Sequence, residues 1–114
     1  MKPVRVQLRR TRGWRKPPNT VVVSRPTKWG NPYALKSYQF ANADGSPAPW
    51  DEQAARAMAL RDFEHALGVG LLKFSEDDVR RELSGKSLAC WCAPGKACHA
   101  DVLLRVANGK VSEA

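Results

Sequence analysis

Apolar and polar residues alternate at the start of the chain, and this pattern predicts two short strands. Residues 4–9 alternate strictly, as in a strand with one buried and one solvent-facing side. A turn-rich stretch at 11–19 contains one glycine and two prolines, and the β-branched run that follows it, 20–23, predicts a second strand. We expect the two strands to pair as a hairpin with a long, basic tip.

Three later segments carry helical patterns. Residues 51–67 begin with acidic residues and place apolar residues at helical spacing. Ser75, followed by Asp78 three positions later, predicts the N-cap of a shorter helix that ends at Gly85. A third helix is predicted over 98–107, with an apolar stripe on one side.

The order of these elements indicates an α/β fold, with one small mixed sheet and about three helices packed on it. A chain of 114 residues suits a single domain, 1–114. We divide it into a basic N-terminal hairpin and loop (1–36), a helical middle (51–84) and a cysteine-bearing strand, loop and helix (86–109). The role of residues 34–50 stays open because their pattern is weak.

The apolar runs and the cysteines indicate the cellular compartment of the protein. No apolar run approaches the roughly 20 residues of a membrane-spanning helix, and the chain start lacks the apolar stretch of a signal peptide. Three cysteines crowded into positions 90–98 suit metal binding or thiol chemistry better than a disulfide framework. We therefore expect a cytoplasmic protein with no membrane partner.

Positive charge is concentrated in the first third of the chain. The formal net charge is +8, and residues 1–43 hold ten Lys or Arg and no acidic residue. Clustered cations neutralise phosphates and release counterions, so this asymmetry favours a nucleotide or nucleic acid as partner. A solvated basic face that only aids solubility is the alternative interpretation.

The most concentrated chemistry lies in the predicted strand 86–92 and the helix after it. Alternation along the strand places Cys90 and Cys92 on one face and Trp91 on the other, where we expect Trp91 to pack in the core. A five-residue connection then brings Cys98 and His99 to the start of the last helix, whose dipole stabilises a thiolate.

Three interpretations of this cysteine site remain open. In the first, Cys90, Cys98 and His99 act on a substrate as nucleophile or acid and base, with Asp101 in the first helical turn as a helper or a cap. In the second, Cys90, Cys92, Cys98 and His99 hold zinc, although their spacing differs from that of zinc fingers. In the third, the cysteines and the histidine are packed core residues.

The loop 24–33 is the second segment rich in chemistry. Two prolines and a glycine exclude regular structure there, and such ordered loops often carry function. Basic, aromatic and amide side chains of this loop and of the preceding basic stretch can hold phosphates and stack on bases. The candidate ligand-binding residues are Arg25, Lys28, Trp29, Asn31, Arg12 and Trp14.

The motifs that carry a resemblance are RRTRGWR at 9–15, RPTKWGNPY at 25–33, GKSLACWC at 85–92 and CHADVL at 98–103. On these the chain resembles, nearly end to end, the uncharacterised bacterial and phage domain-of-unknown-function family 4326. The resemblance implies that the cysteines are hallmark residues of the family. It implies no reaction, cofactor or partner.

The leading hypothesis joins the two segments. We expect the loop and the cysteine site to form one pocket for a phosphate-bearing ligand, a nucleotide or nucleic acid, with thiol-based catalysis as an option. One alternative is a non-enzymatic nucleic-acid-binding module stabilised by zinc. Another is a phage-encoded protein that binds a host factor in the host cytoplasm. The sequence does not give a reaction type or an oligomeric state, so whether the protein is an enzyme stays open.

Overall fold

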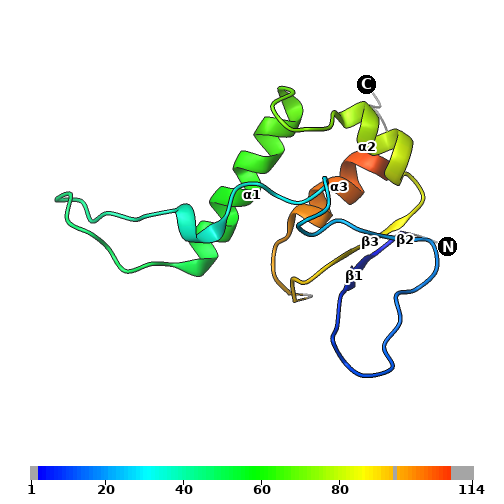
Figure 1. Ribbon diagram of the computed structural model, residues 1–114. Helices are drawn as coiled ribbons and strands as arrows, with labels where there is room; N and C mark the ends of the chain where they lie inside the picture. Colours follow the sequence, from blue (N-terminus) through cyan, green and yellow to red (C-terminus); the bar gives the residue numbers. More distant parts are fainter. Residues whose placement is uncertain (1–2, 94, 109–114) are drawn as a thin grey trace.

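The computed structural model describes residues 3–93 and 95–108. It confirms the α/β class with three helices (Figure 1). The strands are β1 (Arg5–Gln7), β2 (Thr20–Val22) and β3 (Ser87–Cys90). The three α-helices are α1 (Glu52–Gly68), α2 (Glu76–Leu83) and α3 (His99–Asn108), and a short 3₁₀ turn, η1 (Leu35–Ser37), precedes them. Pro94 and Gly109 of the predicted cysteine segment lie outside the described residues.

The sheet has the strand order β1-β3-β2, and both of its strand pairings are parallel. The predicted hairpin of the first two strands is therefore wrong, because β3 lies between them. Leu88, Ala89 and Cys90 of β3 are all buried, and a continuous apolar run of this kind is typical of the central strand of a parallel sheet. In the described part of the chain, antiparallel pairing is confined to one isolated bridge between Ala41 and Pro47.

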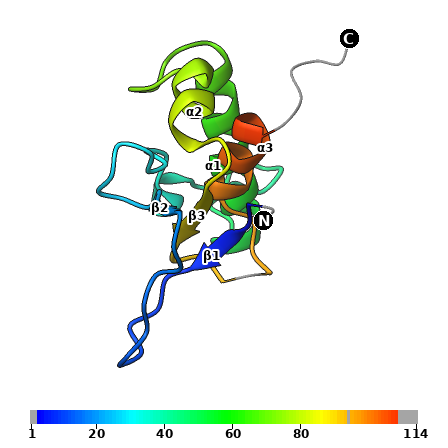
Figure 2. The same cartoon turned by 90° about the vertical axis from the view of Figure 1, so that its right-hand side faces the viewer.

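Helix α3 lies at the centre of the packing. It contacts β3, α1 and α2, so it joins the sheet to the two other helices (Figures 1 and 2). Leu103 of α3, Phe63 of α1, Val79 of α2 and Leu88 of β3 are fully buried in one core cluster. Burying each such side chain stabilises the fold by about 1.5–3 kcal/mol relative to leaving it exposed.

Helix α2 begins as its sequence predicts. The Ser75 hydroxyl accepts a hydrogen bond from the Asp78 backbone N–H at 3.1 Å, and the Asp78 carboxylate accepts one from the Ser75 N–H at 2.9 Å. This reciprocal capping box satisfies two backbone donors that the helix itself leaves unpaired. Helix α1 is capped in a simpler way, by the Asp51 carboxylate, which accepts from the Ala54 N–H.

Two long connections project from the helices and sheet. Residues 8–19, between β1 and β2, extend away from the helices, and residues 38–51, between η1 and α1, form an arm on the opposite side of the molecule (Figure 1). No helix in the described ranges is long and apolar enough to cross a membrane.

Candidate functional site

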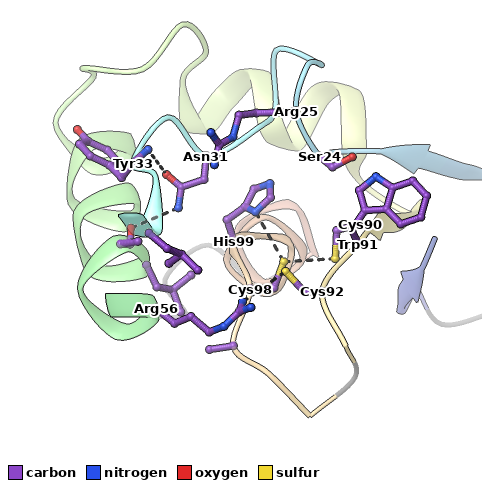
Figure 3. Close-up of a pocket in the computed structure, with 14 residues that line it drawn as sticks. Ser24, Arg25, Asn31, Tyr33, Arg56, Cys90, Trp91, Cys92, Cys98 and His99 are labelled. Carbon is purple, nitrogen blue, oxygen red and sulfur yellow. Dashed lines mark hydrogen bonds between the residues drawn. The ribbon is translucent and has the colours of Figure 1, made fainter. Parts of the chain in front are cut away.

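A cavity of about 310 Å³ opens between three parts of the chain (Figure 3). The loop 24–33 lines one side, α1 lines the second, and the end of β3 with the connection to α3 lines the third. The polar, thiol and aromatic side chains on its wall are Ser24, Arg25, Asn31, Tyr33, Arg56, Cys90, Trp91, Cys92, Cys98 and His99. The expectation that the loop and the cysteines meet in one pocket is thus met by Arg25, Asn31, Cys90, Cys98 and His99 among the predicted residues.

The three cysteine sulfurs form a tight cluster at the base of this cavity. Their Sγ atoms all lie within 4.8 Å of one another, and all three thiols are free. The Cys98 thiol donates to the Cys90 sulfur at 3.3 Å. Cys90 and Cys98 are buried, whereas Cys92 is only partly buried and faces the cavity. The cluster can therefore hold a metal ion, and Cys92 is its most accessible member.

Negative charge in the cluster resides on Cys92. Hydrogen bonds from the Cys90 and Cys98 thiols, together with the Arg56 guanidinium, lower the pKa of Cys92 to about 2. Donating its proton toward Cys90 raises the pKa of Cys98 well above its ordinary value. The hydrogen bond with Cys92 likewise raises the pKa of Cys90. Two thiols therefore stabilise one thiolate, which is the nucleophilic form of cysteine.

Arg56 was not among the predicted site residues. Its Nη1 lies 3.8 Å from the Cys92 sulfur, and its Nε donates to Glu52 at 2.9 Å. The sequence does contain a signal for it, because Arg56 shares a helix face with Ala59 and Leu60, three and four positions later, and both line the cavity. Because the apolar side of α1 faces the interior of the protein, a cationic residue on that side, such as Arg56, also points inward.

His99 is held as a neutral imidazole. Its Nε2 lies 2.8 Å from the Val23 carbonyl oxygen, which only accepts, so Nε2 carries the proton and Nδ1 is left as an acceptor. Nδ1 lies 3.7 Å from the Cys98 sulfur. Burial lowers the pKa of His99, which keeps the ring uncharged near neutral pH. Among the described residues, the cluster of possible metal ligands contains the three cysteines and not His99, so His99 as the fourth zinc ligand stays a prediction.

The loop 24–30 is closed by consecutive turns. Thr27 N–H donates to the Ser24 carbonyl, and Gly30 N–H donates to the Thr27 carbonyl, each at 3.0 Å. A Cβ at Gly30 would lie 2.6 Å from Arg25 Cγ and 2.9 Å from Arg25 N, so only glycine permits this approach. The tight closure fixes the backbone from which Arg25 reaches the cavity (Figure 3).

Asn31 and Tyr33 continue the same wall. The Asn31 carbonyl oxygen accepts from the Tyr33 N–H at 2.8 Å, and its amide nitrogen donates to the Ala59 carbonyl at 3.4 Å. Asn31 therefore ties the loop to α1, and its polar atoms serve the fold as well as the cavity. Tyr33 presents a partly buried ring to the same space.

Two predicted ligand-binding residues of the loop lie elsewhere. Trp29 is 5% exposed and packs against Phe74 with 4.7 Å between ring centroids, so its ring is not available for stacking on a ligand. Lys28 lies over the Trp29 ring and donates to the Glu82 carboxylate at 3.0 Å. Neither residue lines the cysteine cavity. The reason is physical, since burying a tryptophan ring is strongly favourable and α2 offers both the apolar and the acidic partner.

Trp91 is exposed, although the sequence predicted that it packs in the core. It is 46% exposed, lines the cavity mouth and carries the Arg10 guanidinium 4.7 Å from its ring centroid. The prediction that Trp91 packs in the core is wrong because β3 ends at Cys90. Strand alternation therefore no longer determines the direction of the next side chain.

The remaining predicted residues lie outside the cavity wall. The Asp101 carboxylate accepts from Arg5 Nη1 at 2.9 Å, so it joins β1 to the first turn of α3. Arg12 and Trp14 lie on the 8–19 connection and line no part of this cavity. Arg5 also donates to the Ala93 and Lys96 carbonyls, which anchors the connection that carries Cys92.

Comparison with known proteins bears on the identity of the chain. No curated protein and no solved structure matches it. One protein-family model, described as Domain of unknown function (DUF4326), matches residues 6–109. This range includes most of β1, all of β2, the loop 24–33 and all three cysteines, so the resemblance of the motifs is confirmed over nearly the whole length. The chain belongs to the DUF4326 family.

Proposed function

We propose that the protein binds a phosphate-bearing ligand, a nucleotide or the end of a nucleic acid, in the cysteine cavity. The observation that carries the proposal is the charge of the cavity wall. Arg25 and Arg56 come from separate elements and line the same space, and among the described residues no Asp or Glu lines it. Guanidinium groups bind phosphate oxygens through paired N–H donors, and two of them against one Cys92 thiolate leave the wall net positive, which favours an anion.

The two arginines differ in how firmly they are held. Arg56 is positioned by Glu52 and by the Cys92 sulfur. Arg25 forms no hydrogen bond or ion pair within the described ranges, so its donors are available to a ligand. Tyr33 takes the stacking role first expected of Trp29, because its ring lies on the wall while Trp29 is buried.

Any covalent chemistry in this cavity belongs to Cys92. Cys92 lines the cavity, is only partly buried and lies 3.8 Å from Arg56 Nη1, whereas Cys90 and Cys98 are buried and serve as hydrogen-bond donors. The candidate nucleophile is therefore Cys92, whereas the sequence-based hypothesis assigned the chemistry to Cys90, Cys98 and His99. A thiolate beside a cation, here the Arg56 guanidinium, is the arrangement expected of a reactive cysteine.

A second candidate role, compatible with the first, is zinc binding by the three sulfurs. A tetrahedral zinc ion with bonds of about 2.3 Å places its sulfurs about 3.8 Å apart. The three Sγ atoms lie within 4.8 Å of one another, and the Cys90 and Cys98 sulfurs are 3.3 Å apart. Three protein ligands leave a fourth position open to the cavity, as in zinc sites that bind substrate.

Calorimetric titration tests the ligand proposal. Inorganic phosphate and nucleoside monophosphates are titrated into the wild-type chain and into Arg25→Ala and Arg56→Ala. We expect each substitution to weaken binding at least tenfold, since each removes a charge-assisted contact. Arg61→Ala, an exposed arginine of α1 outside the cavity, is the matched control and should bind as the wild type does. Absence of binding by the wild type at low salt contradicts the proposal.

Metal analysis by mass spectrometry tests the zinc role separately. Protein purified without chelator should carry one zinc ion per chain, and Cys92→Ser should lower this content because it removes one of three ligands. His99→Gln should retain the metal, since His99 is not part of the sulfur cluster. A metal-free wild type with reactive thiols refutes zinc binding and leaves the ligand proposal standing.

A further inference from the structure

We infer that the phosphate-bearing ligand is a single-stranded nucleic acid whose end enters the cavity while its backbone lies along the 8–19 connection. This inference rests on the proposed function and names the substrate class. Its basis is one contact, in which the Arg10 guanidinium of the connection lies 4.7 Å from the ring centroid of Trp91. Because Trp91 lines the cavity, this contact joins the basic connection to the cavity mouth.

The connection has the charge of a surface that follows a phosphate backbone. It carries five cations and no acidic residue: Arg9, Arg10, Arg12, Arg15 and Lys16. All five are exposed, and within the described ranges none of them forms an ion pair. The connection projects away from the helices (Figure 1), so a long anion can lie along it without meeting the acidic residues of α2.

Aromatic rings accompany these cations. Trp91 is 46% exposed at the cavity mouth, and Trp14 lies partly exposed within the connection. Trp91 carries the Arg10 guanidinium on its ring, and bases stack on exposed aromatic rings without much sequence preference. Cations interleaved with exposed aromatic rings distinguish a nucleic acid from an acidic protein as the partner.

The size of the cavity indicates a strand rather than a duplex. About 310 Å³ is at the lower end of small-ligand cavities, so it admits a single small unit. A cavity of this size favours one unpaired nucleotide of a single strand over a base-paired end. The rest of the strand then lies outside, and the 8–19 connection is the cationic surface next to the mouth.

Fluorescence anisotropy of the full chain with labelled oligonucleotides tests the inference. Oligothymidylate and oligouridylate of about ten nucleotides are compared with thymidine monophosphate as competitor. We expect the oligonucleotides to bind at least tenfold more tightly than the monophosphate. The slope of log K against log salt should approach about −3.5 if all five cations engage a single strand. Comparing the two oligonucleotides shows whether DNA or RNA is preferred.

Charge-matched variants locate the binding surface. Arg12→Ala with Arg15→Ala should reduce the magnitude of the salt slope by about 1.4. The control pair, Arg61→Ala with Arg81→Ala, removes the same charge from α1 and α2 and should leave the slope unchanged. Trp91→Ala should weaken oligonucleotide binding roughly tenfold, and Trp91→Phe should restore most of it, because an exposed ring serves stacking and not the core.

The outcomes separate this inference from the proposed function. Equal affinities for oligonucleotide and monophosphate overturn the inference and leave the phosphate cavity intact. Binding of neither ligand overturns both. Equal competition by polyglutamate, or equal effects of the two double variants, also overturns the inference, because binding would then follow overall charge. Circular dichroism of each variant confirms that the fold is retained.

Discussion

The Arg56 guanidinium lies 3.8 Å from the Cys92 sulfur, and the two residues come from parts of the chain that the sequence gives no reason to pair. The contact places a fixed positive charge beside Cys92, the most accessible of the three cysteines that line the cavity. Together with the hydrogen bonds from Cys90 and Cys98, it makes Cys92 the site where the electrostatics of the cluster are concentrated.

In metal-free protein, Cys92 should be alkylated by iodoacetamide faster than Cys90 or Cys98, which are buried. Because its pKa is lowered to about 2, Cys92 is already a thiolate at neutral pH, and its rate should be nearly constant from pH 5 to 8. Arg56→Gln should raise this pKa, and Arg61→Gln should not. Mass spectrometry of alkylated peptides gives each rate, and a rate that rises tenfold per pH unit across this range contradicts the thiolate.

His99 should make the fold sensitive to mild acid. Burial lowers its pKa, so the unfolded chain binds a proton more readily than the folded one does. Its contribution to stability is therefore present above the unfolded value of about 6.5 and is lost as pH falls below it. His99→Gln keeps a donor for the Val23 carbonyl and should flatten the fall in Tm between pH 7 and 5.

His65→Gln is the control for this measurement, because His65 is exposed on α1. This variant should follow the wild-type Tm across the same pH range. If both histidine variants follow the wild type, protonation of His99 does not limit acid stability. Thermal melts at several pH values, monitored by circular dichroism, provide the comparison.

Gly30→Ala should damage both stability and phosphate binding. The added Cβ would meet Arg25 backbone and side-chain atoms at 2.6–3.0 Å, so the loop must open. Forcing such an overlap costs about 1–3 kcal/mol, and it also displaces Arg25 from the cavity. Urea denaturation and phosphate titration measure the two effects.

Gly68→Ala is the matched control for this substitution. A Cβ at Gly68 meets nothing within 4 Å, and the residue lies in helical conformation at the end of α1. Alanine there should be neutral or stabilising by up to about 1 kcal/mol, because it reduces the entropy of the unfolded chain. Similar losses at both glycines are incompatible with a specific close approach at Gly30.

Ser75→Ala should destabilise the fold by about 1 kcal/mol, since it removes one half of the capping box that begins α2. Ser84→Ala, at an exposed position just after α2, should leave stability within about 0.5 kcal/mol of wild type. The urea midpoint measures both. An equal shift for the two variants indicates that the cap contributes nothing.

Local signals in the sequence were sufficient where a few neighbouring residues determine the structure. The Ser75 and Asp78 cap depends on a spacing of three, and the helical stripe of α1 depends on its own apolar residues. The meeting of Cys90, Cys92 and Cys98 also follows from a short strand-to-helix connection. In each case the partners lie within one or two elements, so periodicity and capping rules are enough.

The rest depends on long-range packing. Trp29 follows a lysine in a loop and Trp91 lies between two cysteines after a strand, yet Trp29 is the buried one because it packs against Phe74, and Trp91 is exposed because β3 ends before it. The place of Arg56 beside Cys92 depends on how α1 crosses the end of β3. The order of the strands cannot be predicted from alternation either. Alternating apolar and polar residues show which side of a strand is buried, but they do not show which other strand pairs with it.

The central place of β3 also determines when the sheet can exist during synthesis. β1 and β2 leave the ribosome early, but in the described structure each of them pairs only with β3, for instance Val6 with Ala89 and Val21 with Leu88. The two early strands therefore wait, unpaired, until most of the chain has emerged. In a nascent chain stalled before Ser87, β1 and β2 have no strand to pair with, so no sheet forms. The cavity is completed only when α3, which contributes to its wall, has been made.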